Sequence, residues 1–313
     1  MNLLHVKTNL SSEFKSTVAI VLALLSVYII WGSTYLGIKI AIETFPPFLM
    51  AGIRFVIAGS LLYGYVIVKE RKHPKLIEWR DTTIIGTLLL MGGNGLVVIA
   101  EQSIPTSIVA IIIATVPLWM IVIGWMMKSQ TKPNRSTLFG TVLGFCGVAI
   151  LMYPSQQENL HFDLLGLSLT LLAAILWSLG SIYSQKAILP SSTMLSTAMQ
   201  MITGGLVLVM VGTFSGEWQH LNPEAFSSRS FFALMYLIFF GSLLGFSAYV
   251  WLLQNVSPYL ASTYAFVNPI VALILGYFFA DEVLSFKALI ATVFIISAVV
   301  IITFFKAKKK LKR

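Results

Sequence analysis

Runs of hydrophobic residues long enough to cross a lipid bilayer alternate along this chain with short polar linkers. A bilayer span needs roughly 20 predominantly apolar residues. Stretches of about this length occupy residues 17–41, 48–69, 83–103, 106–127, 136–153, 163–187, 193–214, 230–253, 260–280 and 287–306. The longest linker between them, residues 215–229, is too short to form a soluble domain. The pattern therefore predicts an all-α polytopic membrane protein with ten transmembrane helices.

Composition and charge placement refine this prediction. Hydrophobic residues make up 57% of the chain and charged residues 11%, whereas roughly 25% of the residues in soluble domains are charged. A net charge of +9 would suggest nucleic acid as the partner of a soluble protein. With the N-terminus placed in the cytoplasm, however, the inner segments carry seventeen Lys and Arg residues and the outer loops only Arg229 and Lys287. This asymmetry predicts a multi-pass protein of the inner or plasma membrane, with cytoplasmic termini and no nucleic-acid partner.

Similar residues recur in the two halves of the chain at nearly constant spacing. Trp31 matches Trp177 and Gly59 matches Gly205 at an offset of 146 residues. At an offset of 152 residues the matching pairs are Gln102 with Gln254, Pro117 with Pro269 and Gly124 with Gly276. Each half holds five predicted spans, and because five is odd the second half enters the membrane from the opposite side. The spacing therefore predicts two inverted five-helix repeats.

These repeats set the expected domain organisation. The repeats cover residues 17–153 and 163–305 and are joined by an extracytoplasmic linker, residues 154–162. A cytoplasmic segment, residues 1–16, precedes them, and a basic cytoplasmic tail, residues 306–313, follows and anchors the chain at lipid headgroups. Two similar inverted halves can exchange conformations, so an inward-open state implies an outward-open state of comparable energy.

Aromatic and polar side chains interrupt the first and sixth spans at bilayer depth. In helical projection Trp31, Tyr35 and Lys39 share a face of the first span, and Trp177 and Ser181 share the equivalent face of the sixth. Their mid-span position favours a substrate cavity over the alternative, interfacial aromatic residues with small residues for packing. The predicted substrate-binding residues are Tyr28, Trp31, Ser33, Thr34, Tyr35, Lys39, Asn94, Trp177, Ser181, Gln185, Tyr249, Tyr264 and Asn268.

Three charged residues, Lys39, Arg54 and Glu101, fall within predicted spans. An ionised side chain at the bilayer centre costs roughly 2.5–3.5 kcal/mol and less near an end. We therefore expect Glu101 to pair with Arg54 or Lys39 in the outer half of the membrane. This pair is either a structural tie between helices or a gate that breaks when the outer side opens. Lys39 lies near enough to the interface to snorkel instead.

Pro117 and Pro269 lie in the middle of the fourth and ninth spans. Proline removes one backbone hydrogen bond and frees the carbonyl one turn earlier. Each proline therefore predicts a bend, which is either a functional hinge or only a bend. Tyr264 and Asn268 precede Pro269 whereas apolar residues precede Pro117, a difference that favours an amphipathic substrate.

Patterns for nucleotide, metal or catalytic chemistry are absent from the sequence. It has no glycine-rich phosphate loop, so we expect no nucleotide to bind or drive the protein. The four histidines are scattered over both sides of the membrane, and we predict neither a metal site nor a cofactor. The acids are dispersed, and no catalytic nucleophile–base pair can be named, so we do not expect an enzyme. An intramembrane lipid-modifying enzyme is the remote alternative.

Several short motifs together resemble a known family. They are Trp31-Gly-Ser-Thr-Tyr35, Pro46-Pro47 with Ala51-Gly-Ile-Arg54-Phe55, Ala114-Thr-Val-Pro117, Asn255-Val-Ser-Pro258 and Ala265-Phe-Val-Asn268-Pro269. The combination resembles the drug/metabolite transporter superfamily, within it the EamA family, and is similar to the YedA-like inner-membrane exporters. The resemblance implies ten helices in two repeats, a central cavity lined by helices 1, 3, 4, 6, 8 and 9, and export of small metabolites, amino acids among them.

Together these features predict a secondary transporter that works by alternating access of two inverted repeats. Its predicted cargo is a small amphipathic metabolite, such as an amino acid or a related compound, or a drug. The direction, export, rests on the resemblance, and a passive facilitator, or uniporter, or an importer is the alternative. Proton coupling stays open, with Glu101 and Glu282 as the acidic candidates near the membrane. The lipid bilayer is the other expected partner; a monomer suffices for this mechanism, and a dimer is left open.

Overall fold

The regular structure of the described residues is entirely helical. The computed structural model describes residues 3–71, 73–128, 135–152, 163–279 and 286–310. The first half comprises α1 (Leu3–Ala41), α2 (Pro47–Glu70), α3 (Leu76–Gly86), η1 (Thr87–Gly95), α4 (Leu96–Ala100), α5 (Thr106–Ile113), α6 (Val116–Met126) and α7 (Arg135–Met152). The second half comprises α8 (Leu164–Tyr183), α9 (Thr193–Phe214), η2 (Glu217–His220), η3 (Pro223–Ala225), α10 (Ser228–Tyr236), η4 (Leu237–Phe246), α11 (Ser247–Asn255), α12 (Pro258–Ala261), α13 (Tyr264–Phe279) and α14 (Phe286–Lys310).

Seven of these helical segments are long and apolar enough to cross a membrane, counted over the described residues. They are Thr17–Ala41, Pro47–Glu70, Leu76–Ala100, Thr106–Met126, Leu164–Tyr183, Thr193–Phe214 and Ser228–Asn255. The predicted spans 136–153, 260–280 and 287–306 fall on α7, α12–α13 and α14, which do not belong to this set. The polytopic membrane fold is therefore confirmed, while the number ten stays a prediction.

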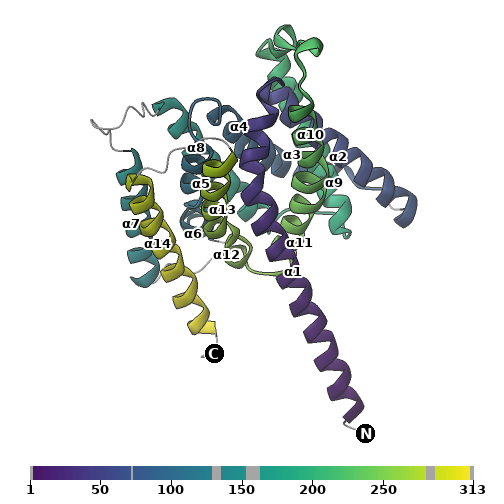
Figure 1. Cartoon of the computed structure of the whole chain (residues 1–313). Helices are drawn as coiled ribbons and strands as arrows, with labels where there is room; N and C mark the ends of the chain where they lie inside the picture. The colour runs from purple at the N-terminus through teal and green to yellow at the C-terminus, as the bar shows by residue number, and fades with distance from the viewer. Residues whose placement is uncertain (1–2, 72, 129–134, 153–162, 280–285, 311–313) are drawn as a thin grey trace.

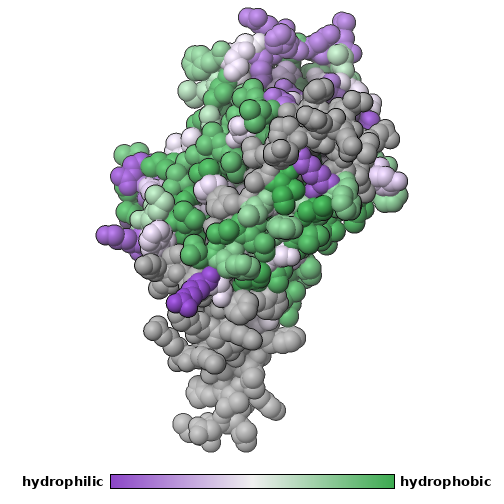
Figure 2. Space-filling model, turned by 90° about the vertical axis from the view of Figure 1, so that its left-hand side faces the viewer, coloured by the Kyte–Doolittle hydropathy of each residue, from purple (hydrophilic) through white to green (hydrophobic). Residues whose placement is uncertain are grey.

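The outer surface of the bundle carries large apolar side chains. Phe214, Val68 and Phe286 are 86%, 79% and 75% exposed. Figure 2 shows hydrophobic residues across the middle of one face, with hydrophilic residues at its top and along its margins. In a bilayer this surface contacts acyl chains, while the helices satisfy their backbone hydrogen bonds internally.

The helices pair across the two halves of the chain (Figure 1). α2 packs along α9 and α7 packs along α14, whereas α1 lies against α13, α10 and η4. α1 begins and α14 ends on the same side of the bundle. The α2–α9 contact is close because both helices use small residues: a Cβ on Gly52 would lie 2.9 Å from the Gly205 carbonyl oxygen, and a Cβ on Gly59 would lie 2.9 Å from that of Ala198.

The third helical segment begins earlier than its hydrophobic run predicts, at Leu76 instead of residue 83. Its first turns are polar, but a capping box stabilises them: the carboxylate of Glu78 accepts a hydrogen bond of 2.7 Å from the backbone N–H of Lys75. Hydropathy does not detect a helix start that capping holds, and this explains the difference.

The helical segments Leu76–Ala100 and Ser228–Asn255 both become π-helical at mid-length. η1 (Thr87–Gly95) contains three glycines, and η4 (Leu237–Phe246) contains two. The π-helix is rare and frequently marks functional sites. Each of these two π-helices packs against a helix from the other half of the chain: η1 packs against α8, and η4 packs against α1.

The two mid-span prolines differ in their effect. Before Pro117 the helix breaks, because α5 ends at Ile113 and α6 begins at Val116, which places the proline in a first turn where it needs no N–H. Pro269 instead lies inside α13, and the break falls earlier, at Ser262 and Thr263. The helix assignments at the two prolines thus differ, and a bend or hinge at either proline stays a prediction.

Candidate functional site

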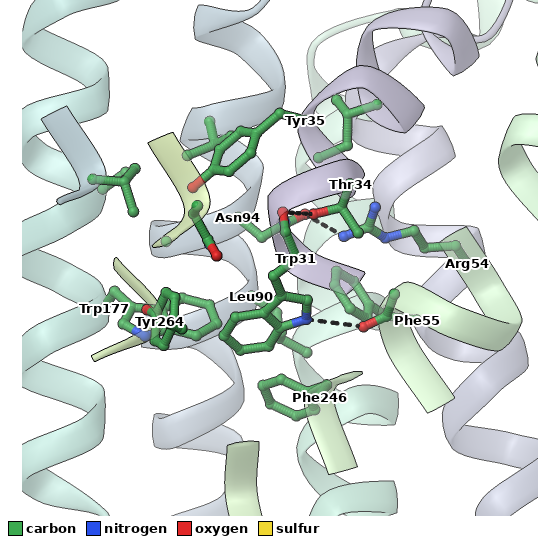
Figure 3. Close-up of a pocket in the computed structure, with 17 residues that line it drawn as sticks. Trp31, Thr34, Tyr35, Arg54, Phe55, Leu90, Asn94, Trp177, Phe246 and Tyr264 are labelled. Carbon is green, nitrogen blue, oxygen red and sulfur yellow. Dashed lines mark hydrogen bonds between the residues drawn. The ribbon is translucent and has the colours of Figure 1, made fainter. Parts of the chain in front are cut away.

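A cavity of about 70 Å³ lies in the middle of the helical bundle, with room for a few water molecules. Helices from both halves of the chain surround it (Figure 3). Its lining consists of Trp31, Thr34, Tyr35, Ile38, Arg54, Phe55, Leu90, Gly93, Asn94, Val97, Ile113, Ala173, Trp177, Gly241, Phe246, Tyr264 and Asn268. The described lining is mainly apolar, with a few polar groups that converge on the centre, as in small-molecule sites.

An aromatic cluster, made of Trp31, Trp177, Tyr249 and Tyr264, forms one end of the cavity. The ring centroid of Trp31 lies 5.3 Å from that of Trp177, 5.0 Å from that of Tyr249 and 5.0 Å from that of Tyr264. The contacts with Trp177 and Tyr264 are edge-to-face, at 84° and 90°. This geometry is the favourable one for aromatic pairs. The cluster therefore joins α1, α8, α11 and α13 at one point.

Hydrogen bonds hold the polar edges of this aromatic cluster. Nε1 of Trp31 donates to the Gly241 carbonyl oxygen over 3.2 Å, and Nε1 of Trp177 donates to the Tyr249 hydroxyl over 3.0 Å. The same hydroxyl lies 2.7 Å from Oγ of Ser181. Buried indole and phenol groups usually need such partners. The rings are thus fixed in orientation as well as in position.

Two glycines let the π-helices approach the tryptophans closely. A Cβ added to Gly245 would lie 2.6 Å from Nε1 of Trp31, and one added to Gly93 would lie 2.5 Å from Cε3 of Trp177. Real Cβ atoms do not approach other heavy atoms this closely, so both positions require glycine unless the indole ring moves.

The polar wall of the cavity is built around Arg54, which is 3% exposed. Nη2 of Arg54 donates to Oδ1 of Asn94 over 2.8 Å, and the guanidinium lies 4.3 Å from the centroid of the Phe55 ring (Figure 3). The amide of Asn268 also lines the cavity and is buried near the Tyr35 hydroxyl, although neither of its polar atoms makes a well-formed hydrogen bond. The described polar lining therefore includes one cation and two amides.

The predicted pairing of Glu101 is only partly reflected in these contacts. Glu101 is buried at the end of α4, close enough to Arg54 to interact with it electrostatically. Between these two described residues no direct hydrogen bond forms, and Asn94 is the acceptor that Arg54 uses. A gating role for Glu101, Arg54 or Lys39 stays a prediction, and Glu282 lies outside the described residues.

The structure brings seven of the predicted substrate-binding residues to the cavity wall. They are Trp31, Thr34, Tyr35, Asn94, Trp177, Tyr264 and Asn268. Tyr249 and Ser181 are buried behind them and orient Trp177. Placement does not test binding, so their role as substrate contacts stays a prediction.

Four predicted residues lie elsewhere. Gln185 is exposed in the turn after α8, which ends at Tyr183, so its helical projection does not apply. Ser33 points away from the cavity, with its Oγ 2.6 Å from the Tyr236 hydroxyl, and Tyr28 bonds to Thr263 over 2.6 Å. Lys39, near the end of α1, is also not part of the lining.

Some lining residues escaped prediction from the sequence. Phe55, Leu90, Val97 and Phe246 are ordinary apolar residues, and nothing in their local pattern separates them from helix-packing residues. Arg54 and Phe55 also add α2 to the wall, which the family resemblance did not imply. Arg54 was expected only as an ion-pair partner, yet a cation inside a span is itself a signal of an internal polar site.

The described residues offer little to metal or covalent chemistry. Within the ranges described, no group of three His, Cys, Asp or Glu residues gathers where it could hold a metal ion. What the cavity provides is one cation, amides, hydroxyls and aromatic faces. These groups suit reversible recognition of a small molecule.

Comparisons with known proteins agree with this architecture. The chain is 37% identical over 292 residues to an inner membrane transporter, YedA, of Escherichia coli strain K12, covering 93% of this chain and 92% of the relative. It is 28% identical to the protein PecM of Dickeya dadantii, covering 90% and 93%. A crystal structure of a protein with 16% sequence identity has the same fold, with a TM-score of 0.64 over 93% of this chain and 98% of that one.

A family model extends over nearly the whole chain. The model of the EamA-like transporter family matches residues 17–153 and again residues 164–304. The two matched segments together hold all the helices that line the cavity. The protein is therefore a membrane transporter, and it belongs to the EamA-like transporter family.

Proposed function

We propose that this protein is a secondary transporter of the inner membrane that exports small amphipathic metabolites, such as amino acids and related compounds, or drugs. Ten helices in two inverted five-helix repeats surround the substrate path, and the central cavity is its binding site. The E. coli relative bears the name of an inner membrane transporter, which supports the location. The seventeen inner cations against two outer ones support cytoplasmic termini.

The observation that carries this proposal is a set of reciprocal contacts. If two repeats are related by a two-fold axis, each contact between them has a partner contact in which the repeats change roles. Trp31 packs on Gly245 and Trp177 packs on Gly93, which are positions 146 and 152 residues apart. Gly52 with Gly205 has the counterpart Ala198 with Gly59. Such pairs are the expected product of an inverted repeat.

The aromatic cluster gives alternating access a physical form. The cavity of about 70 Å³ has room for only a few water molecules, so a larger substrate enters only when helices move apart. Because the cluster joins α1 and α13 to α8 and α11, it closes the cavity when its four rings are in contact. Separation of these rings opens the cavity on their side, and the reciprocal glycine contacts allow the opposite repeat to make the equivalent movement.

A passive facilitator, or uniporter, or an importer is the second candidate. It is favoured by the absence of a carboxylate among the described lining residues, since Glu101, the acid that interacts with Arg54, is not one of them. A facilitator moves substrate only down its gradient, so a proton uncoupler leaves its efflux unchanged. An intramembrane lipid-modifying enzyme is disfavoured by the absence of a nucleophile–base pair among the described lining residues.

The test compares the growth medium of cells that overproduce the protein with that of cells producing the Trp31→Ala variant, by mass spectrometry. The matched control is Trp125→Ala, which removes an indole that is 46% exposed on α6. We expect a metabolite that accumulates outside with the wild type and the control, but not with Trp31→Ala. Equal media from wild type and empty-vector cells would contradict export.

An uncoupler arm then separates the driving forces. Loss of accumulation on adding the uncoupler supports proton coupling, and unchanged accumulation supports facilitated efflux. Net uptake of the same compound from the medium would make the protein an importer. Export that persists in Trp31→Ala would show that the aromatic cluster is not part of the substrate path.

A further inference from the structure

Arg54 has hydrogen-bonding capacity that the protein does not use. Its Nη2 donates to Asn94, but neither Nε nor Nη1 has a hydrogen-bond partner among the described residues, and both atoms are buried. The guanidinium lines the central cavity and points toward its middle (Figure 3). A buried N–H group that finds no acceptor destabilises the folded protein, and it does so more strongly when it is charged. An acceptor in the cavity would remove this destabilisation.

The chemistry of the vacant donors indicates which acceptor fits. Guanidinium presents a planar fork of N–H groups that matches the two oxygens of a carboxylate. Its plane is held by the Phe55 ring at 4.3 Å and by the bond to Asn94, so the fork is oriented before a ligand arrives. Arg54 is the one cationic side chain among the described lining residues. A single cation suits a carboxylate better than a phosphate dianion.

We propose that Arg54 binds the carboxylate of the transported compound, so that the protein selects carboxylate-bearing substrates over cations and neutral amides. This inference rests on the proposed function, because it assigns the substrate class of the same cavity. The aromatic rings of Trp31 and Trp177 lie across the cavity and take the apolar part of the substrate. The unbonded amide of Asn268 supplies a further polar contact.

The surroundings of Arg54 allow its charge to be used in this way. Glu101 interacts with Arg54 electrostatically but does not occupy its N–H groups. The carboxylate of Glu101 therefore acts on the charge of Arg54, while Nε and Nη1 of Arg54 keep their capacity to donate to a ligand. Asn94, the residue that does bond to Arg54, is neutral and does not compensate the charge.

The test measures protection of the purified full chain against thermal unfolding in detergent by matched pairs of small compounds. The pairs are propionate with propionamide, benzoate with benzamide, and 3-phenylpropionate with 3-phenylpropionamide; phenethylammonium and phenyl phosphate complete the panel. Ligands that bind the native state raise its Tm with concentration. We expect each carboxylate that fits to protect at a concentration at least about tenfold lower than its amide, and phenethylammonium not to protect.

The variants assign this preference to a residue. In Arg54→Gln the advantage of carboxylate over amide disappears, and in Arg54→Lys it is reduced because a lysine lacks the fork. Arg229→Gln, which removes a half-exposed arginine paired with Glu43 at 3.6 Å, retains the preference. Each variant is compared with its own ligand-free Tm, so a loss of stability alone does not imitate the result.

Three outcomes overturn the inference. They are protection by no carboxylate of the panel, equal protection by carboxylates and amides, and a preference that survives Arg54→Gln. If phenyl phosphate protected the protein more strongly than the carboxylates do, the inferred substrate class would be phosphate compounds instead of carboxylates. None of these outcomes changes the result of the export measurement with Trp31→Ala. A wrong substrate class can therefore be distinguished from a wrong transport function.

Discussion

The indole of Trp31 rests directly on the backbone of Gly245, so closely that a Cβ at residue 245 would lie 2.6 Å from Nε1 of the ring. The corresponding pair, Trp177 on Gly93, repeats this contact with the two halves of the chain exchanged. Each tryptophan thus belongs to one half and is accommodated by a π-helix of the other. The two contacts connect helices that separate during transport in the mechanism proposed above.

Substitution of either glycine by alanine is expected to displace a tryptophan. In Gly245→Ala the new methyl group must push Trp31 off its hydrogen bond to Gly241, and the ring has little room because three other aromatic rings surround it. Overpacking of this kind costs about 1–3 kcal/mol. The Tm in detergent and the amount of exported metabolite should therefore both decrease. Thermal unfolding and the export assay measure these two quantities.

The matched control for this prediction is Gly64→Ala in α2. A Cβ at Gly64 meets nothing within 4 Å, and alanine in a helix is about 0.5–1 kcal/mol more favourable than glycine. The control should therefore keep or raise the Tm and retain export. If Gly245→Ala behaves like Gly64→Ala, the indole adapts without cost and the contact does not shape the cavity.

Asp81 is expected to hold the linker between α8 and α9 against α3. Its Oδ2 accepts a 2.6 Å bond from the backbone N–H of Ile188, and its Oδ1 accepts a 2.9 Å bond from Nε of Arg80. Asp81→Ala leaves the Ile188 N–H without its acceptor, which costs about 1–3 kcal/mol. Hydrogen–deuterium exchange should then become faster in the peptide 184–192.

Two milder variants calibrate this result. Asp81→Asn keeps an acceptor oxygen, and Tyr183→Phe removes only a 3.3 Å bond to Asp81, so both should change the exchange less than Asp81→Ala does. Exchange in Asp81→Ala that matches the wild type would show that other contacts hold the linker.

Glu217 is expected to stabilise the start of α2 from a distant loop. Its two carboxylate oxygens accept bonds from the backbone N–H groups of Phe48, at 3.1 Å, and Leu49, at 2.8 Å. Because these N–H groups have no partner inside the helix and lie at its positive end, Glu217→Ala should cost about 1–2 kcal/mol. The decrease in Tm relative to the wild type measures this loss of stability. Glu224→Ala, an exposed acid of the same loop, is the control and should leave the Tm unchanged.

The N-cap of α8 is expected to make stability depend on pH at the acidic end. A hydrogen bond with the Ser103 side chain and the backbone N–H of Leu165 hold the pKa of Asp163 below its ordinary value of 3.8. A lowered pKa in the folded state means that the ionised carboxylate contributes stability at pH values above about 4. This contribution is lost as the pH falls through the lower, folded pKa.

The variant Asp163→Asn isolates that contribution. The difference in Tm between wild type and Asp163→Asn should be constant above about pH 5 and should shrink below pH 4, because the wild-type carboxyl becomes neutral there. A difference that grows on acidification would have the wrong sign and would show that Asp163 is not stabilised in its ionised form.

The all-helical membrane fold and the two similar segments of the chain were predictable because hydropathy and residue spacing are local or periodic properties. Trp31, Tyr35, Asn94 and Trp177 were expected at a central site because polar groups inside a span must avoid lipid, and the structure places them around one cavity. Gln185 was misplaced because its helix ends two residues earlier, which hydropathy alone does not reveal.

What the sequence alone determined was therefore an all-helical membrane protein of the EamA type, with polar and aromatic residues in spans that cannot face lipid. Only the tertiary structure decided how these residues combine: that Arg54 donates to Asn94 while it interacts electrostatically with Glu101, that Phe55 brings α2 into the wall, and that glycines in two π-helices lie directly against the tryptophans. The reason is physical. The choice of partner and the close approach of backbone to ring depend on the distance and rotation between helices far apart in the chain, and no local pattern specifies these quantities.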